Sequence, residues 1–310
     1  MKAKTKAPVI NDTINLTEES YFAGRAESYL RQVLRRFCRH KLGLVGVILI
    51  ATISLLSVLA PVLAPYDPTA IHPLDALGGK PAAPSAKYLL GTDNLGRDIL
   101  SRVLYGGQIS LSVGLGAMLI SLVIGIPMGC LMGYYGGAID FLGSRLIDFM
   151  CCIPTFFLIL IVNSLLDSQS VFNVMLVLGL FGWMGISRQI RSQFLAMRDQ
   201  EFVQAAISLG IPTWRVVFKH ILPHAIVPVI VEATMGIGGF IVSESGLSFL
   251  GLGIQEPNAS WGSMLKTAQT YMRTAPWMAI VPGVLITVTV MSFNFVGDAL
   301  RDALDPRGIR

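Results

Sequence analysis

The chain has 310 residues, of which 53% are hydrophobic and only 14% are charged. Soluble domains carry about 25% charged residues, so this composition excludes an ordinary soluble domain and indicates a membrane protein. The formal net charge of +5 is therefore interpreted as topology information and not as a nucleic-acid signal. Because apolar runs are spread along the whole length, we expect one polytopic bundle rather than two domains.

Six apolar runs predict an all-α fold with six transmembrane helices. The expected spans cover residues 42–64, 109–132, 141–165, 171–187, 226–247 and 277–296. The first follows a basic segment, residues 1–41, and begins too late for an ordinary cleaved signal peptide, so we expect it to remain as an anchor. In the second, Gly125, Gly129 and Gly133 recur every four residues, which predicts close packing against another helix.

Lysine and arginine set the expected orientation. With a cytoplasmic N-terminus, the inside holds the 298–310 tail and the basic cluster Arg25, Arg31, Arg35, Arg36, Arg39 and Lys41. Of the 24 Lys and Arg residues, the outside then holds only Lys80, Lys87, Arg97, Arg102, Lys266 and Arg273. The positive-inside rule therefore predicts that both termini are cytoplasmic. The basic cluster can act as a topology anchor or bind anionic lipid.

The first expected extracytoplasmic loop, residues 65–108, is Pro-rich and ends in "GTDNLGRDILSR". The Gly-Thr-Asp at its start is typical of a helix beginning. Asp93 with Arg97, and Asp98 with Arg102, are acid-to-base pairs four residues apart, as suits one helical face. Two interpretations stay open: a surface helix leading into the second span, or a docking or gating element on the outer face.

The second extracytoplasmic loop, residues 251–276, predicts a short re-entrant or surface helix, with Trp261 at interfacial depth. Just before it, Glu232 and Glu244 lie in or near the fifth span. Charge inside a membrane is costly and tends to face a cavity, so both are candidates for the translocation pathway. Glu244, the deeper one, either meets a cationic group of a passing solute or is a hydrogen-bonded structural residue at a helix end.

Signatures of catalysis are missing from the sequence. The "GGKP" at residues 78–81 lacks the upstream glycine and the Ser or Thr of a P-loop, and no G-x-S-x-G occurs. His220 and His224 are four apart, but Pro223 sits between them and no third metal ligand is evident. The four cysteines, Cys38, Cys130, Cys151 and Cys152, predict neither a metal site nor a disulfide framework. We therefore expect no catalytic residue, no metal site and no nucleotide hydrolysis by this chain.

A cytoplasmic loop, residues 199–225, contains "QAAISLGIPTWRVVFKHILPHA". Its first part predicts a helix with one apolar face, formed by Phe202, Ala205, Ala206 and Leu209. Gly210 suits the left-handed position after that helix, and Pro212 prevents the helix from continuing.

Thr213 is then expected to cap a second helix, which Pro223 ends near the membrane. Its apolar ridge consists of Trp214, Val217, Phe218 and Ile221. The two helices make a knob that either fills a groove on a cytoplasmic partner or lies flat on the inner leaflet.

This loop resembles the EAA loop of membrane subunits of ATP-binding-cassette (ABC) importers. Ala205, Ala206, Gly210, Leu222 and Pro223 stand at the matching spacing. The chain departs from the pattern at Gln204, where the family often has Glu, and at His220, where it often has Ile. The resemblance implies ATPase coupling by this loop, with the candidate residues Glu201, Gln204, Ala205, Ala206, Gly210, Trp214, Phe218, Leu222 and Pro223.

The resemblance extends over nearly the whole chain. "LLGTDNLGRDILSRVLYGGQISLSVG", "LSFLGLGIQEPNASWGSML" and "FNFVGDALRDALDP" look like the second (C-type) permease of the dipeptide, oligopeptide and nickel branch. This implies a type I importer permease in the cytoplasmic membrane of a bacterium or archaeon, with residues 109–297 as a five-helix core. The implied partners are a homologous permease, an external solute-binding protein and two cytoplasmic ATPases. Those ATPases use ATP and Mg, and this chain binds no cofactor of its own.

Other classes stay open on the sequence alone. A permease of the same branch can carry nickel, glutathione-like or other small solutes. An ion-coupled secondary carrier predicts uptake by this chain alone and often an internal repeat, which the sequence does not show convincingly. A non-transporting membrane scaffold predicts no substrate-dependent ATPase activity in the assembled complex.

Overall fold

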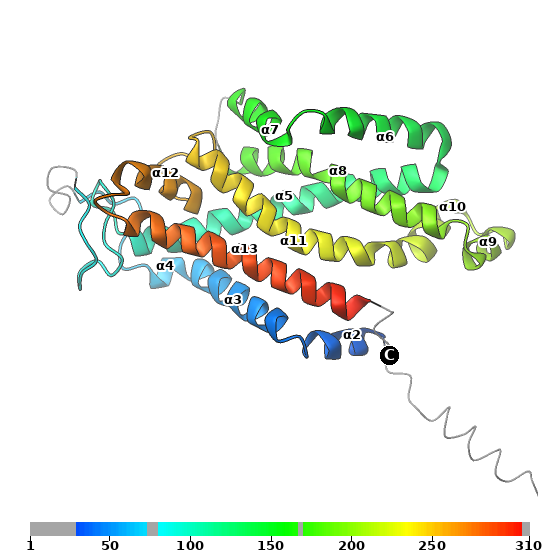
Figure 1. The fold of residues 1–310 in the computed structure, drawn as a ribbon, viewed down its shortest axis with the longest axis horizontal. Helices are drawn as coiled ribbons and strands as arrows, with labels where there is room; N and C mark the ends of the chain where they lie inside the picture. The colour runs from blue at the N-terminus through cyan, green and yellow to red at the C-terminus, as the bar shows by residue number, and fades with distance from the viewer. Residues whose placement is uncertain (1–28, 73–79, 167–169, 306–310) are drawn as a thin grey trace, which may run out of the picture.

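The computed structural model describes residues 29–72, 80–166 and 170–305, and it is helical almost throughout (Figure 1). Arg25, Gly78, Gly79 and residues 306–310 of the tail lie outside the described residues. The elements are α2 (Tyr29–Phe37), α3 (Lys41–Val58), α4 (Ala60–Leu63), α5 (Ile99–Tyr135), α6 (Gly137–Cys151), α7 (Thr155–Ser164), α8 (Val171–Met197), α9 (Glu201–Ser208), α10 (Thr213–Arg215), the π-helix η2 (Val216–Ile221), α11 (Leu222–Phe249), α12 (Trp261–Tyr271) and α13 (Trp277–Leu304). Within these ranges the β-structure is one isolated bridge between Thr92 and Asp98, so the predicted all-α class is confirmed.

Among the described residues, five helices are long and apolar enough to cross a membrane, and the bent pair α6–α7 is a sixth candidate if both helices together form one span. The predicted spans therefore correspond to helices of the structure, but several of these helices extend beyond the predicted spans. The helix that contains the second span begins at Ile99, that of the fourth runs on to Met197 and that of the sixth to Leu304. Hydropathy marks only the apolar middle of such helices, because their ends carry polar residues that keep the helical backbone.

The third span is not the continuous helix expected over residues 141–165. Its two halves, α6 and α7, are bent by 80° at residues 152–154. Pro154 stands at the N-cap of α7 and has no N–H with which to continue the hydrogen bonding of α6. Beyond the bend, the buried amide of Asn163 donates to the carbonyl oxygen of Leu252, which fixes α7 against the end of α11.

Helices α5 and α8 pack closely along their length, as the predicted glycine face requires. A Cβ added to Gly125, Gly129 or Gly133 would lie 2.9, 2.6 or 2.4 Å from the nearest side-chain atom of α8. The facing residues are Ile186, Ile190 and Phe194, all buried. Each glycine therefore lets a bulky residue of the neighbouring helix approach the backbone.

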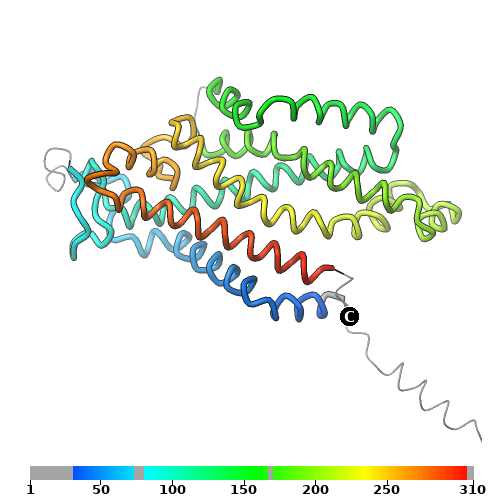
Figure 2. The backbone as a smooth tube through the Cα atoms, viewed as in Figure 1, coloured from blue at the N-terminus to red at the C-terminus, as the bar shows by residue number. Residues whose placement is uncertain are grey.

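The remaining helices complete an elongated bundle in which α11 runs between α8 and α13, and α3 lies along α13 (Figure 2). One end of the bundle carries α9, α10, α2 and the end of α13, and we call it the α9 end (Figure 1). The opposite end carries α12 and the segment before α5, and we call it the α12 end. The first described helix and the last one therefore meet at the same end, as the orientation prediction requires.

Candidate functional site

The corner of the predicted knob forms at Gly210. Its φ of +72° lies in the left-handed region that favours glycine. The Gly210 amide donates to the carbonyl of Ile207 at 2.9 Å, and the Ile211 amide donates to that of Ala206 at 3.2 Å. These two bonds close the end of α9 in the pattern of a Schellman motif, so the predicted conformation of Gly210 is confirmed.

The second half of the knob differs from the prediction. Thr213 does not cap a helix, because Pro212 occupies the N-cap and provides no side-chain hydrogen bond. Pro223 does not end a helix either, since it falls in the first turn of α11, directly after the π-helix η2. A proline is tolerated in a first turn because its missing N–H is not needed there. One helical path therefore runs from Thr213 to Phe249.

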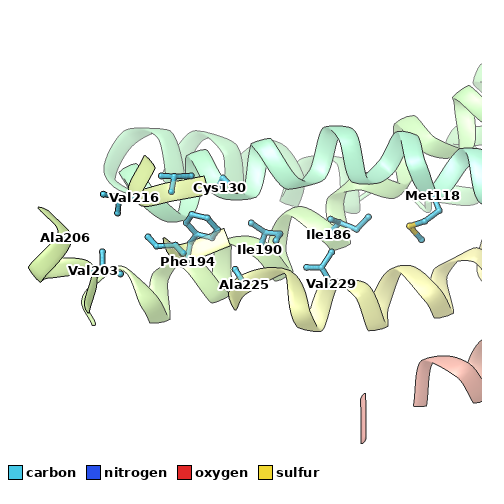
Figure 3. Packing of buried hydrophobic residues seen from close by; sticks show 12 residues of the cluster. Met118, Cys130, Ile186, Ile190, Phe194, Val203, Ala206, Val216, Ala225 and Val229 are labelled. Carbon is cyan, nitrogen blue, oxygen red and sulfur yellow. The ribbon is translucent and has the colours of Figure 1, made fainter. Parts of the chain in front are cut away.

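The base of the knob is anchored in the bundle (Figure 3). Val203 and Ala206 of α9, with Val216 and Ile221 of η2, belong to one buried cluster. The same cluster includes Cys130 of α5 and Ile190 and Phe194 of α8. Of the predicted apolar face of α9 only Ala206 is buried, whereas Phe202, Ala205 and Leu209 are exposed. Val203, which the prediction did not include, is buried beside Ala206 against the ends of α5 and α8.

Five large apolar side chains of the knob are exposed: Ile207, at 45%, and four that were predicted from the sequence. We call these four the apical patch: Phe202, Leu209, Trp214 and Phe218, with exposed fractions of 44%, 80%, 61% and 60%. The predicted ridge is therefore divided, since Val217 and Ile221 are buried while Trp214 and Phe218 are not. An exposed apolar patch rimmed by polar residues marks an interaction surface.

The other predicted coupling residues differ in exposure. Glu201, Ala205 and Pro223 are exposed, Leu222 is half-buried, and Ala206 is buried. The side-chain amide of Gln204 donates to the carbonyl of Arg198 at 3.1 Å. A glutamate carboxylate is a poor substitute at that contact, because when ionised it can only accept hydrogen bonds. Gln204, where the chain departs from the EAA pattern, is therefore bound to the end of α8.

A second set of predicted residues meets at the α12 end. The Arg97 guanidinium lies 2.6 Å from the Asp93 carboxylate and 2.5 Å from that of Glu256. Arg102 lies 2.9 Å from Glu256, and its guanidinium also donates to the carbonyl of Pro68 at 3.2 Å. We call Asp93, Arg97, Arg102 and Glu256 the arginine–carboxylate cluster. It joins the segment before α5, the first turn of α5 and the loop after α11.

The cluster is buried apart from Glu256. The side chains of Asp93, Arg97 and Arg102 are only 2–6% exposed, whereas that of Glu256 is 45% exposed. Burial by itself lowers the pKa of Arg97, but its bonds to Glu256 and Asp93 raise that pKa above the ordinary value. Arg97 therefore stays charged, and the cluster fixes two loops by charge-assisted hydrogen bonds.

The segment containing Asp93 and Arg97 is not the surface helix expected from its spacing. Gly91 and Gly96 have φ of +80° and +76°, which no regular helix contains. Asp93 instead accepts hydrogen bonds from the backbone amides of Leu95 and Arg97, both at 2.9 Å, and so closes a tight turn. The pair Asp93–Arg97 does form, but across this buried turn rather than along a helix.

The predicted pair between Asp98 and Arg102 is wrong. Asp98 is the N-cap of α5 and accepts from the amide of Ser101 at 2.8 Å. Arg102 is drawn instead to Glu256, a residue that the sequence reasoning did not single out. A usable signal existed, because Glu256 is the sole carboxylate of residues 251–276 and two arginines stood in the facing loop.

Glu244 is fully buried in a group of serines. Its carboxylate accepts from Ser248 at 2.7 Å and from Ser110 of α5 at 3.2 Å. Ser110 in turn accepts from the backbone amide of Trp261, the first residue of α12. In this structure the surroundings of Glu244 are those expected of a hydrogen-bonded structural residue. Its contact with a solute stays a prediction.

The short helix expected in residues 251–276 is present as α12, and it begins with a capping box at Ser260 and Ser263. Trp261 is not at interfacial depth, because it is 1% exposed and its indole N–H donates to the carbonyl of Val103 at 3.1 Å. Glu232, the other predicted pathway residue, is half-buried and lines a cavity between α8, α11 and α13. Among the described residues, no group of three or more His, Cys, Asp or Glu side chains could hold a metal.

The fold and these sites first define a class: a multi-pass helical membrane protein with the exposed apical patch at one end and the buried arginine–carboxylate cluster at the other. Residues 125–310 match the family described as binding-protein-dependent transport system inner membrane component. Residues 28–84 match the N-terminal transmembrane domain of oligopeptide transport permease C. The chain therefore belongs to the family of inner membrane components of binding-protein-dependent transport systems, the permease subunits of ABC importers.

Relatives agree over nearly the full length. The dipeptide transport system permease protein DppC of Alkalihalophilus pseudofirmus is 38% identical over 91% of this chain and 91% of its own. The oligopeptide permease OppC of Haemophilus influenzae is 38% identical, covering 97% and 95%. The glutathione permease GsiD of Pectobacterium atrosepticum is 36% identical, covering 89% and 91%.

A solved structure shares the fold. An inward-facing structure of the MetNI methionine ABC transporter aligns with 66% of this chain and 96% of its own, with a TM-score of 0.53 and 19% identity. At that identity the similarity concerns the arrangement of helices alone.

Proposed function

We propose that this chain is one of two permease subunits of an ATP-driven importer that carries dipeptides or oligopeptides across the cytoplasmic membrane of a bacterium. The observation that carries the proposal is the 38% identity, over at least nine-tenths of both chains, to permeases named for dipeptides and for oligopeptides. The glutathione relative, at 36% identity, makes a modified tripeptide the second candidate substrate.

The proposed complex contains a homologous permease, two ATPases that use ATP and Mg, and an external solute-binding protein. In it the α9 end faces the cytoplasm, in keeping with the basic residues of α2 and of the loop before α11. The apical patch docks in a groove of an ATPase, which the exposure of Trp214 and Phe218 above a buried base supports. ATP-driven closure of the ATPases then moves the spans between outward and inward access.

At the opposite end, the arginine–carboxylate cluster is proposed to hold the outer loops in the shape that the solute-binding protein meets. The support is geometric: Glu256 is the exposed member of a group whose other members are buried. An exposed carboxylate on such a rigid base suits a docking surface better than one on a mobile loop does.

Uptake by the reconstituted complex tests the substrate. This chain, the second permease, the ATPases and the binding protein are assembled in proteoliposomes and supplied with labelled dialanine, tetra-alanine, glutathione or nickel. ATP-dependent accumulation of the alanine peptides is expected. Accumulation of nickel or glutathione alone would replace the proposed substrate, and uptake by this chain without ATPases would indicate a secondary carrier.

Cysteine cross-linking tests the docking surface. In a background without the four native cysteines, Trp214→Cys should cross-link to an ATPase carrying cysteines along its groove. Leu142→Cys is the matched control, because Leu142 is similarly exposed, at 66%, but belongs to α6 and not to the knob. Equal cross-linking of both variants would contradict the proposed seat of the apical patch, and selective labelling of Trp214→Cys from the outside would contradict the orientation.

A further inference from the structure

Glu232 is a carboxylate within a membrane span and has no partner in the described part of the chain. It lies ten residues beyond the start of α11, roughly 15 Å along the helix axis. It is half-buried, and no hydrogen bond or ion pair to its carboxylate occurs among the described residues. Ionisable groups at such depth are costly and usually face a partner or a water-filled cavity. Glu232 therefore differs from Glu244, whose carboxylate is fully hydrogen-bonded.

The space beside Glu232 is large enough for a small solute. A cavity of about 800 Å³ is lined by Glu232, Gln189, Pro228, Met235, Arg301 and Asp305, among others. Small-molecule sites have volumes of about 300–1,000 Å³. On the facing helix, a Cβ added to Gly185 would lie 2.9 Å from the Glu232 Oε1 atom, so this glycine leaves the carboxylate room.

The charges of the cavity favour a cation next to Glu232. Two carboxylates, Glu232 and Asp305, and one guanidinium, Arg301, line it. Arg301 and Asp305 stand at the end of α13, whereas Glu232 stands within the span. The rest of the lining near Glu232 consists of apolar groups and the uncharged Gln189. A carboxylate in such surroundings accepts hydrogen bonds and attracts positive charge more strongly than one in water.

We propose that this cavity binds the primary ammonium group of the transported solute and that Glu232 is its acceptor. The inference rests on the proposed function, in which that group is the N-terminal ammonium of a peptide. An ammonium offers three donors, and the Glu232 carboxylate and the Gln189 side-chain oxygen are acceptors in the cavity. Val227, Val231 and Met235 supply apolar lining that suits varied side chains, so the site recognises the end that all peptides share.

Binding to the purified complex in lipid nanodiscs, without the solute-binding protein, tests the proposal. Labelled dialanine and N-acetyl-dialanine are compared, since acetylation removes the ammonium and leaves the rest of the peptide. Glu232→Gln should weaken dialanine binding by about tenfold or more, the usual effect of losing a charged hydrogen-bond partner, and leave the acetylated peptide unchanged. Glu232→Asp should keep part of the preference for the free ammonium because it keeps the charge.

Asp302→Asn is the matched control, because Asp302 is an exposed carboxylate of α13 that pairs with His40 and does not line the cavity. It should bind both peptides as the wild type does. Equal losses for both peptides in Glu232→Gln, or no loss, would overturn the proposal. Loss of the second permease from purified Glu232→Gln complex would also overturn it, by assigning the carboxylate to a basic residue of that subunit. Failure of the wild type to take up any peptide would refute the proposed function as well, whereas normal uptake with unchanged binding refutes this inference alone.

Discussion

Substitution of Gly210 separates backbone conformation from side-chain contact in the knob. No atom lies within 4 Å of a Cβ added there, so an alanine would meet no obstacle. Its cost is the left-handed backbone alone, about 1–2 kcal/mol at the observed φ of +72°. Asparagine tolerates that conformation better, because its short polar side chain can bond locally.

Proline at position 210 should act differently. Its ring fixes φ near −65°, and it removes the N–H that donates to the carbonyl of Ile207. The corner then cannot form, and a hydrogen bond worth about 1 kcal/mol is lost as well. The base of the knob remains, because Val203 and Val216 are buried on the ends of α5 and α8.

The assay measures peptide uptake, ATPase activity and subunit composition of the reconstituted complex. Gly210→Asn should approach wild-type uptake, Gly210→Ala should be reduced, and Gly210→Pro should abolish uptake while the complex still assembles. ATP hydrolysis by the proline variant should no longer respond to the loaded binding protein. Normal peptide uptake by Gly210→Pro would refute the coupling role, and equal loss in all three variants would refute the argument from backbone strain.

Three further predictions concern stability and the pathway. Glu256→Ala leaves two buried arginines short of a partner and should destabilise the subunit by about 1–3 kcal/mol, less than a fully buried pair because Glu256 is 45% exposed; an unchanged melting temperature would contradict the cluster's structural role. Gly129→Leu should destabilise α5–α8 packing by at least about 1–3 kcal/mol, since a Cβ there already lies 2.6 Å from α8. Gly283→Leu, where a Cβ meets nothing within 4 Å, should melt as the wild type does, and equal melting of both variants would sink the packing argument. Glu244→Gln should lower stability by about 1–2 kcal/mol and leave the ratio of uptake rates among peptides unchanged, whereas a changed ratio in transport assays would indicate contact with solute.

The spans were predictable because each is a long apolar run, and membrane crossing demands such runs. The glycine face of α5 was predictable for a similar reason, since close packing needs small residues at helical spacing. The bend between α6 and α7 was not predicted, although Pro154 indicates it. An apolar run that contains one proline either bends or continues, and contacts such as that of Asn163 with Leu252 are not visible in sequence.

The prediction for the segment before α5 was wrong because it considered only pairs of residues that are neighbours along the chain. Asp93 and Arg97 have the spacing of a helical pair, yet Asp93 also bonds the backbone of its own turn. Arg102 takes a partner more than 150 residues away, in Glu256. Spacing along the chain indicates which pairs can form on a helix. Two buried arginines, however, pair with the carboxylates that lie close to them in the fold, because a buried charge without a partner is costly.

In the knob, Gly210 was predictable because only a left-handed residue turns the chain so tightly. Pro223 was not, because a proline is permitted both after a helix and in its first turn. The two possibilities differ only in whether the residues before Pro223 are continuous with α11. In the structure they are, because the π-helix η2 runs directly into α11. That Glu232 has no partner among the described residues was equally hidden, because it depends on which side chains α8 and α13 place beside it.

The uninterrupted path from Thr213 to Phe249 has a mechanical consequence. Its 37 residues span roughly 55 Å and include Trp214 of the apical patch near one end and Ser248, beneath the loop that precedes α12, near the other. Helices bend most readily at π turns and prolines, so η2 and Pro228 are the two places where this path can yield. If the apical patch docks on an ATPase as proposed, a rotation applied at Trp214 passes η2 and Pro228 before it reaches Glu232 and the serine group around Glu244.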